Sequence, residues 1–516
     1  MLSSLQSQAP ISGPLLTWMQ QPSAMGFSIF AAILIATVVR STWNPTRDDY
    51  DTVNPRKWFE FTDAEATKKF LIHARDYLHV SHKTTPNRPF RVIADVGDTL
   101  VLPNSYADEV RNIKDLDNDA VSRKDFHTHL SSFASFRIGV DGSGLSKSVV
   151  QKQLTQSLGL VTDPLSTECD LALREVLSDN QDWHLISPLR DAVLMIVARL
   201  SSKVFLGEEL CHNQEWLKIT AEHTTTAFQA VEELRLWPPI LRPVVHWVLP
   251  SCRRARAQIA RSREIINPVL EKRREARRWG GERPHDGIEW FENNAKGRNY
   301  DPALAQLNLS IAAMHTTTDL LMQTILDIAK HPEIVEPLRQ EVRGALHEHG
   351  WEKTALYKMK LLDSAIKETQ RIKPIQMISM RRLPLRNITL SDGTLLRKDR
   401  EVVVAADRMW DESVYTEPEI WNPYRFYKLR KAQGSSFEHT AQLVSTSADH
   451  LGFGHGMHAC PGRFFAANEV KVALAQLLLK YDWKLPEGAD ASFLQHGWSM
   501  VANPFVGILL RRRDEN

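Results

Sequence analysis

A cysteine in a glycine-rich stretch of the C-terminal quarter is the residue best placed to do chemistry. Cys460 lies in residues 453–462, a loop rich in small residues, and an apolar helical pattern follows over residues 464–479. The unpaired N–H groups and positive end of such a helix lower the pKa of a cysteine, which favours its thiolate as a nucleophile or metal ligand. Glycines in the loop let the backbone approach a flat ligand closely. The alternative is an inert cysteine buried in a tight turn.

A threonine near the middle of a long helical pattern is the second candidate. The dipeptide Asp-Pro at residues 301–302 is a good start for a helix, and the pattern runs on to residue 330. That helix would be about 43 Å long, enough to cross a whole domain. The Thr316 hydroxyl could bond back to the Ala312 carbonyl and admit a water, and His315 could pass protons. Both side chains could instead be ordinary interior residues of the helix.

Two charged segments follow this helix in the sequence. Glu368 and Arg371 stand three residues apart, so they would share one face of a helix. Residues 421–426 read WNPYRF and contain Arg425. Taken alone, the Glu–Arg spacing is usually explained by a surface ion pair.

In this order and at these separations, the motifs resemble those of the cytochrome P450 family. The residues that match its haem-binding signature are Phe453, Gly456, His458, Cys460 and Gly462. In that family the cysteine thiolate is the axial ligand of the haem iron. The resemblance covers roughly residues 55–511. It implies a mainly α, cytochrome P450-like domain with small β-sheets, in which Cys460 binds the iron of haem b.

The resemblance also assigns residues to the distal side of the haem. Ala312 and Ala313 would be the small residues that pass over the haem, and Thr316 would be the catalytic alcohol. His315 stands where the family commonly has an acid, so this chain departs from the pattern there and its proton route differs.

Further roles implied by the resemblance concern the haem carboxylates and the core. Arg381, with Arg382 as the fallback, and His458 would hold the haem propionates, because a guanidinium suits a carboxylate. Glu368, Arg371 and Arg425 would form a buried trio that braces the core on the haem side.

The totals exclude some classes of function. The chain has 516 residues, with 64 Lys+Arg against 62 Asp+Glu, so no global charge points to nucleic acid. Its four cysteines are far apart and lack CxxC spacing, so neither a zinc site nor a disulfide framework is indicated. We expect the catalytic part to lie in a reducing compartment.

The N-terminal region predicts a membrane anchor. No charged residue precedes Arg40, and we divide the chain into an uncharged segment (1–24), a transmembrane anchor (25–40) and a catalytic domain (41–516). The apolar residues would span about 22 Å, somewhat short of a hydrocarbon core of roughly 30 Å, which suits the thinner endoplasmic reticulum membrane. Arg40 and Arg47 after the apolar run predict a single-pass anchor with the catalytic domain in the cytosol. A cleaved signal peptide and a buried core helix are the alternatives.

Other segments of the sequence predict the secondary structure around the site. Residues 90–95 and 99–103 read as strands of a small sheet. Residues 234–250 hold four prolines and two tryptophans and cannot form one regular helix, so they are either a mobile lid near the membrane or a packed loop. Residues 253–278 are basic and helical in pattern, with a kink expected at Pro268. A solvated face explains most such basic runs.

The amino-acid sequences of residues 315–317, 328–332 and 449–456 are most similar to those of fungal secondary-metabolism members of the family. That implies an oxidoreductase, a microsomal monooxygenase that oxidises an apolar terpenoid, indole alkaloid or polyketide with O2. The chain has no flavin or nicotinamide fingerprint, so electrons from NADPH would come through a separate NADPH–cytochrome P450 reductase. A haem-thiolate isomerase, dehydratase or coupling enzyme, and a haem protein without catalysis, are the alternatives.

Overall fold

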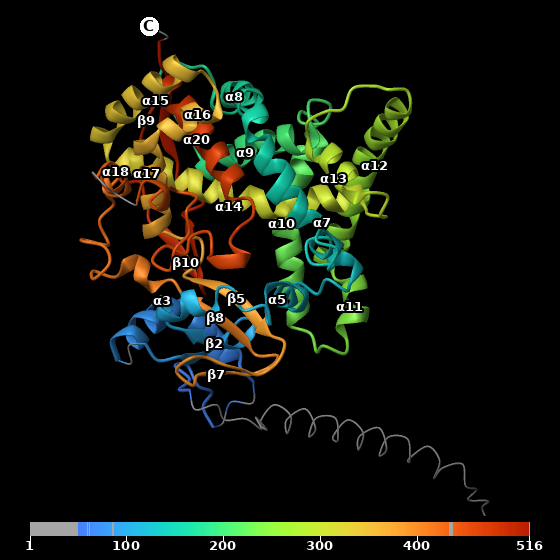
Figure 1. The fold of residues 1–516 in the computed structure, drawn as a ribbon, viewed down its shortest axis with the longest axis vertical. Coiled ribbons are helices and arrows are strands. Elements are labelled where there is room, and N and C mark those ends of the chain that lie inside the picture. The colour runs from blue at the N-terminus through green and yellow to red at the C-terminus, as the bar shows by residue number, and fades with distance from the viewer. Residues whose placement is uncertain (1–49, 59, 61, 85–86, 433–436, 515–516) are drawn as a thin grey trace, which may run out of the picture.

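Helix α14 (Pro302–Lys330) runs through the middle of the fold, and the other elements are arranged around it (Figure 1). The structure is a computed structural model that describes residues 50–514, apart from residues 59, 61, 85–86 and 433–436. Most of the helices gather on one side of the molecule, whereas a small sheet with helix α3 occupies one end (Figure 1).

The bounds of α14 follow from local chemistry and confirm the prediction. The Asp301 carboxylate accepts hydrogen bonds from the N–H groups of Ala303 and Leu304, and Pro302 occupies the first turn. The helix ends at Lys330, just before the dipeptide at 331–332, where proline disfavours further helix.

The other helices are the following. The N-terminal half contains α3 (Ala64–Thr84), α4 (Ala107–Val110), α5 (Asn118–Asp125), α6 (Ala134–Arg137), α7 (Leu145–Ser148), α8 (Thr155–Leu177), α9 (Leu189–Leu206), α10 (Gln214–Arg235) and α11 (Arg242–Val248). The C-terminal half contains α12 (Pro250–Arg278), α13 (Gly287–Ala295), α15 (Val335–His349), α16 (Lys353–Lys358), α17 (Lys360–Ile372), α18 (Arg425–Lys431), α19 (Phe437–Thr440) and α20 (Arg463–Lys480). A π-helical segment, Val149–Leu154, joins α7 to α8.

The strands form small sheets, as predicted. The largest has the order β1-β2-β8-β5-β3, in which β2 and β8 are parallel and the other pairs are antiparallel. Its strands are β1 (Phe90–Ala94), β2 (Gly97–Leu102), β3 (Leu116–Asp117), β5 (Ile378–Pro384) and β8 (Glu401–Ala405). The smaller sheets are built from β4 (His184–Ile186), β12 (Ile508–Arg512) and β9 (Tyr481–Lys484), from β10 (Phe493–His496) and β11 (Ser499–Ala502), and from β6 (Ile388–Thr389) and β7 (Leu395–Leu396).

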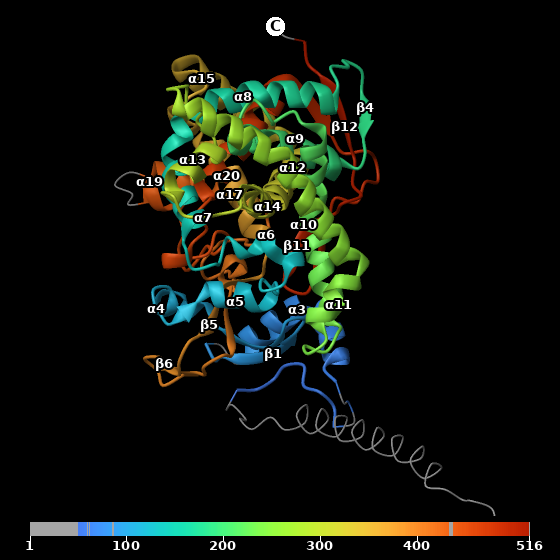
Figure 2. The same ribbon diagram turned by 90° about the vertical axis from the view of Figure 1, so that its right-hand side faces the viewer.

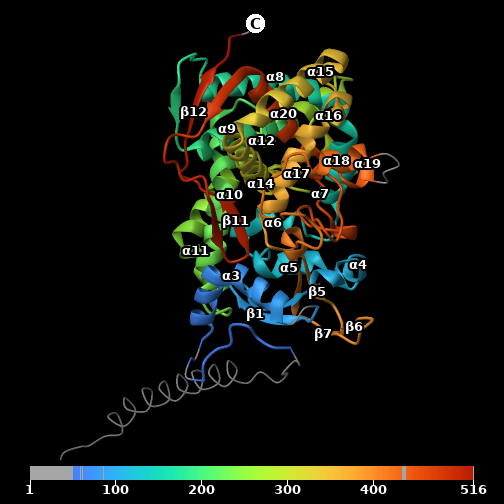
Figure 3. The ribbon, with the colours of Figure 1, turned by 90° about the vertical axis from the view of Figure 1, so that its left-hand side faces the viewer.

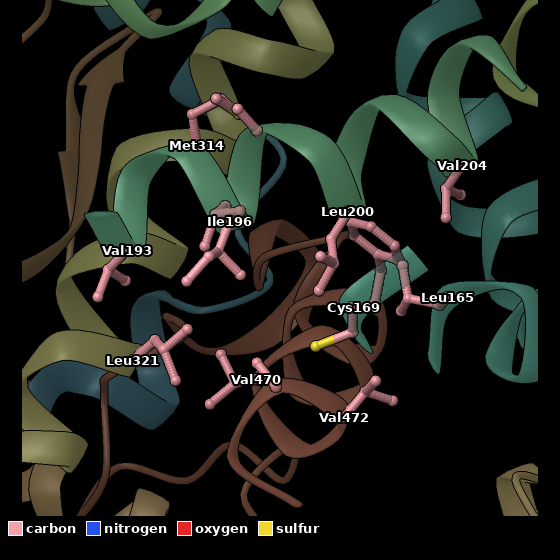
Figure 4. Close-up of a cluster of buried hydrophobic side chains, with 14 of the residues drawn as sticks. Leu165, Cys169, Val193, Ile196, Leu200, Val204, Met314, Leu321, Val470 and Val472 are labelled. Atoms are coloured by element: carbon pink, nitrogen blue, oxygen red, sulfur yellow. The ribbon is translucent and has the colours of Figure 1, made fainter. Parts of the chain in front are cut away.

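The main hydrophobic core lies where α8, α9, α14, α17 and α20 pack together. Figure 3 shows α17 and α20 close to α14 near the centre of the molecule. Figure 4 shows part of this core, in which Cys169 of α8 lies between Leu200 of α9 and the valines Val470 and Val472 of α20. Burial of these apolar side chains fixes α14 and α20 against each other, which positions the residues of the candidate site.

The proline-rich segment at 234–250 is broken, as predicted. Helix α10 ends at Arg235, the short α11 follows, and α12 begins at Pro250. Helix α12 continues through Pro268 as one element. The predicted anchor at residues 25–40 lies outside the described residues. Within the part of the chain that the structure describes, no helix is both long and apolar enough to span a membrane.

Candidate active site between Cys460 and Thr316

Cys460 lies in a loop held at the N-terminus of α20. Its N–H donates to the Phe453 carbonyl at 2.8 Å, and Nη1 of Arg463 donates to the Cys460 carbonyl at 2.8 Å. Gly456 has φ of 76°, and a Cβ at this position would overlap Arg111. Only glycine therefore fits there without displacing a neighbour. The loop presents a single sulfur from a well-braced backbone.

The acidity of this thiol differs from the expectation. Burial raises the pKa of the Cys460 thiol above its ordinary value, and this outweighs the lowering by the N–H of Gly462 and by Arg463. The prediction of a lowered thiol pKa is therefore wrong for the free thiol: the N–H groups at the helix N-terminus do lower it, but desolvation of the anion is the larger effect. A bound metal ion reverses this balance, since a coordinating thiol is deprotonated outright.

The surroundings of Cys460 suit a group that needs a single protein ligand. Among the described residues, no group of three or more His, Cys, Asp or Glu side chains with metal-ligand proximity includes Cys460. A protein zinc site needs three or four such ligands, whereas haem supplies four nitrogens of its own and needs one protein sulfur. The site therefore fits haem by its chemistry.

Thr316 faces an open side of α14. Its hydroxyl donates to the Ala312 carbonyl at 3.0 Å and approaches the Ala313 carbonyl at 3.3 Å, which is the back-bond expected from the sequence. Ala312 and Thr316 are exposed, although Met314 between them is buried. Small exposed side chains one turn apart, in the middle of a central helix, leave room for a flat ligand on that face.

His315 is poorly suited to act as a proton-donating acid beside Thr316. Arg190, from the start of α9, donates through Nη2 to His315 Nδ1 at 3.2 Å, so Nδ1 is an acceptor. Burial and Arg190 lower the pKa of His315 to about 4. The imidazole is therefore neutral at pH 7, and its acceptor nitrogen is already occupied by a guanidinium.

Asp319 is an acid that the sequence reasoning missed. It lies four residues after His315 and three after Thr316, hence on neighbouring positions of the helix surface. Burial raises the pKa of Asp319 to about 6, although the N–H of Ala502 donates to its Oδ1 at 2.8 Å and Gln323 donates to its Oδ2. Only the one-turn spacing from Thr316 could have signalled it.

The two candidate carboxylate-binding arginines lie in different surroundings. Arg381 donates to Glu401 at 2.8 Å and to Asp125 at 2.6 Å, so two acids already pair with it. Arg382 is buried, which lowers its pKa to about 10. Burial, Arg382 and Lys147 together lower the pKa of His458 to about 4. The structure therefore gathers His458 and Arg382 near Lys147, beside the Cys460 loop.

The structure brings the three charged core residues together. Arg371 donates to both oxygens of Glu368 at 2.9 Å, and Nε of Arg425 donates to Glu368 Oε1 at 2.9 Å. Glu368 and Arg371 are completely buried. Arg371 also donates to the carbonyls of Pro418 at 2.6 Å and of Met409, so it ties α17 to the segment that precedes Arg425.

The chain matches known proteins along most of its length. The family model described as Cytochrome P450 matches residues 173–510. Cytochrome P450 monooxygenase 1 of Gibberella fujikuroi is 47% identical over 438 residues, which covers 84% of this chain and 99% of that protein. Cytochrome P450 monooxygenase hepE of Aspergillus oryzae is 44% identical and covers 97% of this chain and 92% of that protein. Dihydromonacolin L monooxygenase mokC of Monascus pilosus is 39% identical, with 91% and 90% covered.

A solved structure shows the same fold. The retinoic-acid-bound cyanobacterial CYP120A1 superposes with a TM-score of 0.62 at 18% identity and covers 87% of this chain and 96% of that one. The relatives of high identity are fungal monooxygenases, and the motifs at Cys460, Thr316 and Glu368 occur in a mainly helical fold with small sheets. This chain belongs to the cytochrome P450 family.

Proposed function

We propose that this protein is a membrane-associated haem-thiolate monooxygenase that oxidises an apolar secondary metabolite. The observation that carries the proposal is the single sulfur of Cys460 at the start of α20, together with the open, alanine- and threonine-lined face of α14. The names of the fungal relatives support monooxygenation as the reaction class.

Haem b would be held by Cys460 as the iron ligand and by cationic side chains at its carboxylates. When bound, haem activates O2 with two electrons, which here would come from NADPH through a separate reductase. His458 and Arg382 suit one carboxylate edge, since both lie beside the Cys460 loop with Lys147 near them. Arg381, the first choice from the sequence, is also proposed to bind a haem carboxylate. Phe453, Gly456 and Gly462 would shape the loop so that the sulfur reaches the iron.

Thr316 would position a water and the proton that the reaction needs on the open face of α14. Its back-bond to the Ala312 carbonyl leaves the oxygen lone pairs free to accept from a water. His315 would act as a neutral group that accepts from Arg190 and fixes this part of the helix against α9. Asp319, whose pKa of about 6 allows both protonation states near neutrality, would be the acid of the relay in place of His315.

The trio of Glu368, Arg371 and Arg425 would brace the fold below the Cys460 loop. Each guanidinium donates to the Glu368 carboxylate and to backbone carbonyls, so the one carboxylate and the neutral carbonyl oxygens together satisfy both cations. Such a network is costly to break, and its loss would release the segments that carry the haem loop.

An aromatic cluster would make the substrate region apolar. Phe126 stacks on Phe136 with ring centroids 4.6 Å apart, and Phe228 of α10 meets both rings at 5.7 Å. Ile311, the neighbour of Ala312 on α14, packs against the same cluster. Aromatic and aliphatic surface next to the open face of α14 favours an apolar substrate of the terpenoid, indole alkaloid or polyketide classes.

An exposed apolar surface supports association with the endoplasmic reticulum membrane. We call it the apolar rim, and its exposed members in and before α11 are Leu236, Trp237, Ile240, Leu241, Val244, Trp247 and Val248. Figure 2 shows α11 at the same end of the molecule as α3, whose Ile72 and Val80 are also exposed. Tryptophans beside aliphatic side chains suit a membrane interface.

The proposal is tested by expressing the chain with an NADPH–cytochrome P450 reductase in yeast microsomes. Terpenoid, indole and polyketide candidates are incubated with and without NADPH and O2. We expect an oxygenated product, with oxygen from ¹⁸O2, that requires both NADPH and O2. Turnover of a substrate without NADPH would instead indicate the isomerase or dehydratase alternative, and a ligand-induced spectral shift without any product would indicate a non-catalytic haem protein.

A further inference from the structure

Three side chains with different donor atoms meet outside the Cys460 loop. Glu168 lies on α8, and Cys211 and His212 lie in the connection between α9 and α10. Their donor atoms, a carboxylate oxygen, a sulfur and an imidazole nitrogen, all lie within 4.8 Å of one another. This cluster could not be predicted from the sequence, because its cysteine and histidine are adjacent to each other but distant from the glutamate.

The separations are close to those of a metal site. Nε2 of His212 lies 2.9 Å from Oε2 of Glu168. Two ligands of a tetrahedral zinc ion, bound at roughly 2.0–2.3 Å, are about 3.3–3.8 Å apart, so the pair needs to open by only a few tenths of an ångström. The proton now shared between this nitrogen and oxygen occupies the place where a cation would bridge them.

Burial and charge favour a cation here. Glu168 is 1% exposed and Cys211 is buried. Arg199 donates to Oε1 of Glu168 at 2.8 Å and also to Glu175, so the guanidinium is shared between two carboxylates. Oε2 of Glu168 is left facing His212. With a Cys211 thiolate added, the two buried acidic groups outnumber the one buried guanidinium, that of Arg199, which is also shared with the exposed Glu175. A cation would offset the remaining negative charge.

The connection that carries Cys211 and His212 is rigid. Gly207 closes α9 with φ of 75°, and the Cys211 N–H donates to the Gly207 carbonyl at 3.1 Å. Asn213 caps α10 by accepting from the Trp216 N–H. Because both ends of the connection are fixed, its backbone does not have to be ordered when a metal binds.

We propose that Glu168, Cys211 and His212 form a zinc site with a fourth position open to water. A mixed sulfur, nitrogen and oxygen donor set selects zinc over magnesium or calcium, which prefer oxygen alone. Binding forms one Zn–S, one Zn–N and one Zn–O bond. The Cys211 thiol releases its proton to water, and His212 shifts its proton from Nε2 to Nδ1, so that the neutral imidazole offers Nε2 to the metal. The side chain of His212 is 46% exposed, which leaves access for the ion and for a water ligand. The bound ion would pin α8 to the connection between α9 and α10.

The test measures zinc in the haem-loaded protein carrying an affinity tag without histidines. The protein is equilibrated with zinc sulfate and passed into metal-free buffer, and zinc and iron are counted by mass spectrometry. We expect one zinc per haem iron in the wild type. Cys211→Ser and His212→Gln should each lower the zinc content about tenfold or more at unchanged iron content. Cys169→Ala is the matched control, because Cys169 is the residue next to Glu168 but packs in the core (Figure 4), and it should keep its zinc.

A second measurement keeps the proposal falsifiable if a variant loses haem. Zinc K-edge X-ray absorption of the wild type should show one sulfur at about 2.3 Å and nitrogen or oxygen at about 2.0–2.2 Å. Wild-type protein that retains less than a tenth of an equivalent of zinc, zinc bound equally by both ligand variants, or a first shell without sulfur would each overturn the site. None of these results depends on monooxygenase activity.

Discussion

Removal of Arg425 is expected to cost much more stability than removal of an exposed arginine with the same ion-pair geometry. In the Arg425→Ala variant, Glu368 loses the donor at 2.9 Å but keeps both hydrogen bonds from Arg371. The carbonyl of Thr416, which accepts from Arg425 at 2.7 Å, also loses its donor. Loss of one partner from a buried charge network costs about 3–5 kcal/mol, and we expect the lower value, about 3 kcal/mol, because Arg371 still neutralises the carboxylate.

Arg386→Ala is the control for that prediction. Arg386 lies 2.8 Å from Asp115, but the two side chains are 68% and 40% exposed. An exposed pair contributes about 0–1 kcal/mol, since water screens it and the side chains lose entropy on pairing. The two ion pairs that these variants remove therefore differ in burial but hardly in their nitrogen–oxygen distance.

Urea unfolding of the haem-loaded proteins gives the comparison, followed by tryptophan fluorescence and by the haem absorbance. The change in midpoint multiplied by the slope gives the change in the free energy of unfolding. We expect about 3 kcal/mol for Arg425→Ala, a factor of roughly 150 in the folded-to-unfolded ratio, and under about 1 kcal/mol for Arg386→Ala. Equal midpoints for the two variants would refute the reasoning that burial of the trio stabilises the fold.

Three further predictions concern the proposed proton relay and the apolar rim. Thr316→Ala should raise NADPH consumption per product severalfold while the haem spectrum stays normal, and unchanged coupling would remove Thr316 from the relay. Asp319 has a pKa raised to about 6 from 3.8, so its protonated form favours the folded state; this stability is fully present below pH 3.8 and is lost as the pH rises through about 6. Asp319→Asn should therefore flatten the fall in the urea midpoint between about pH 4 and 6, and an unaltered pH profile would contradict the raised pKa. Replacement of Trp237 and Trp247 by serine should weaken binding of the chain without residues 1–49 to phosphatidylcholine vesicles severalfold, whereas Trp279→Ser, at another exposed tryptophan, should leave vesicle binding unchanged.

Much of the fold was predictable because local chemistry sets it. The N-cap at residues 301–302 and the proline at 332 fix α14, and the four prolines in residues 234–250 break the chain between α10 and α12. The contact between Glu368 and Arg425 followed from the resemblance, since nothing local links residues so far apart in the sequence.

The different surroundings of Arg381 and Arg382 could not be predicted from sequence spacing. The pairing of β5 with β8 shifts register between Ser379 and Arg382, and Met380 has φ of 53°. A bulge of this kind changes which side chain faces which side of a sheet, so alternation along the strand cannot be counted from the sequence. The result is that Arg381 faces Glu401 and Asp125, whereas Arg382 influences His458.

The acidities of Cys460 and His315 were also beyond the sequence. The helix N-terminus next to Cys460 was visible as a pattern, but the burial that outweighs it depends on packing from distant elements. In the same way, Arg190 lies 125 positions before His315, and only the packing of α9 on α14 brings the guanidinium to the imidazole.

The most direct test of the account is the reduced, carbon-monoxide difference spectrum of the wild type and of Cys460→Ser, with Cys252→Ser, at a buried cysteine, as the control. We expect the wild type and Cys252→Ser to show the absorption band of thiolate-ligated haem and Cys460→Ser to lack it. A thiolate-type band that survives in Cys460→Ser, or folded wild-type protein that takes up no haem, would contradict the assignment of Cys460 as the iron ligand.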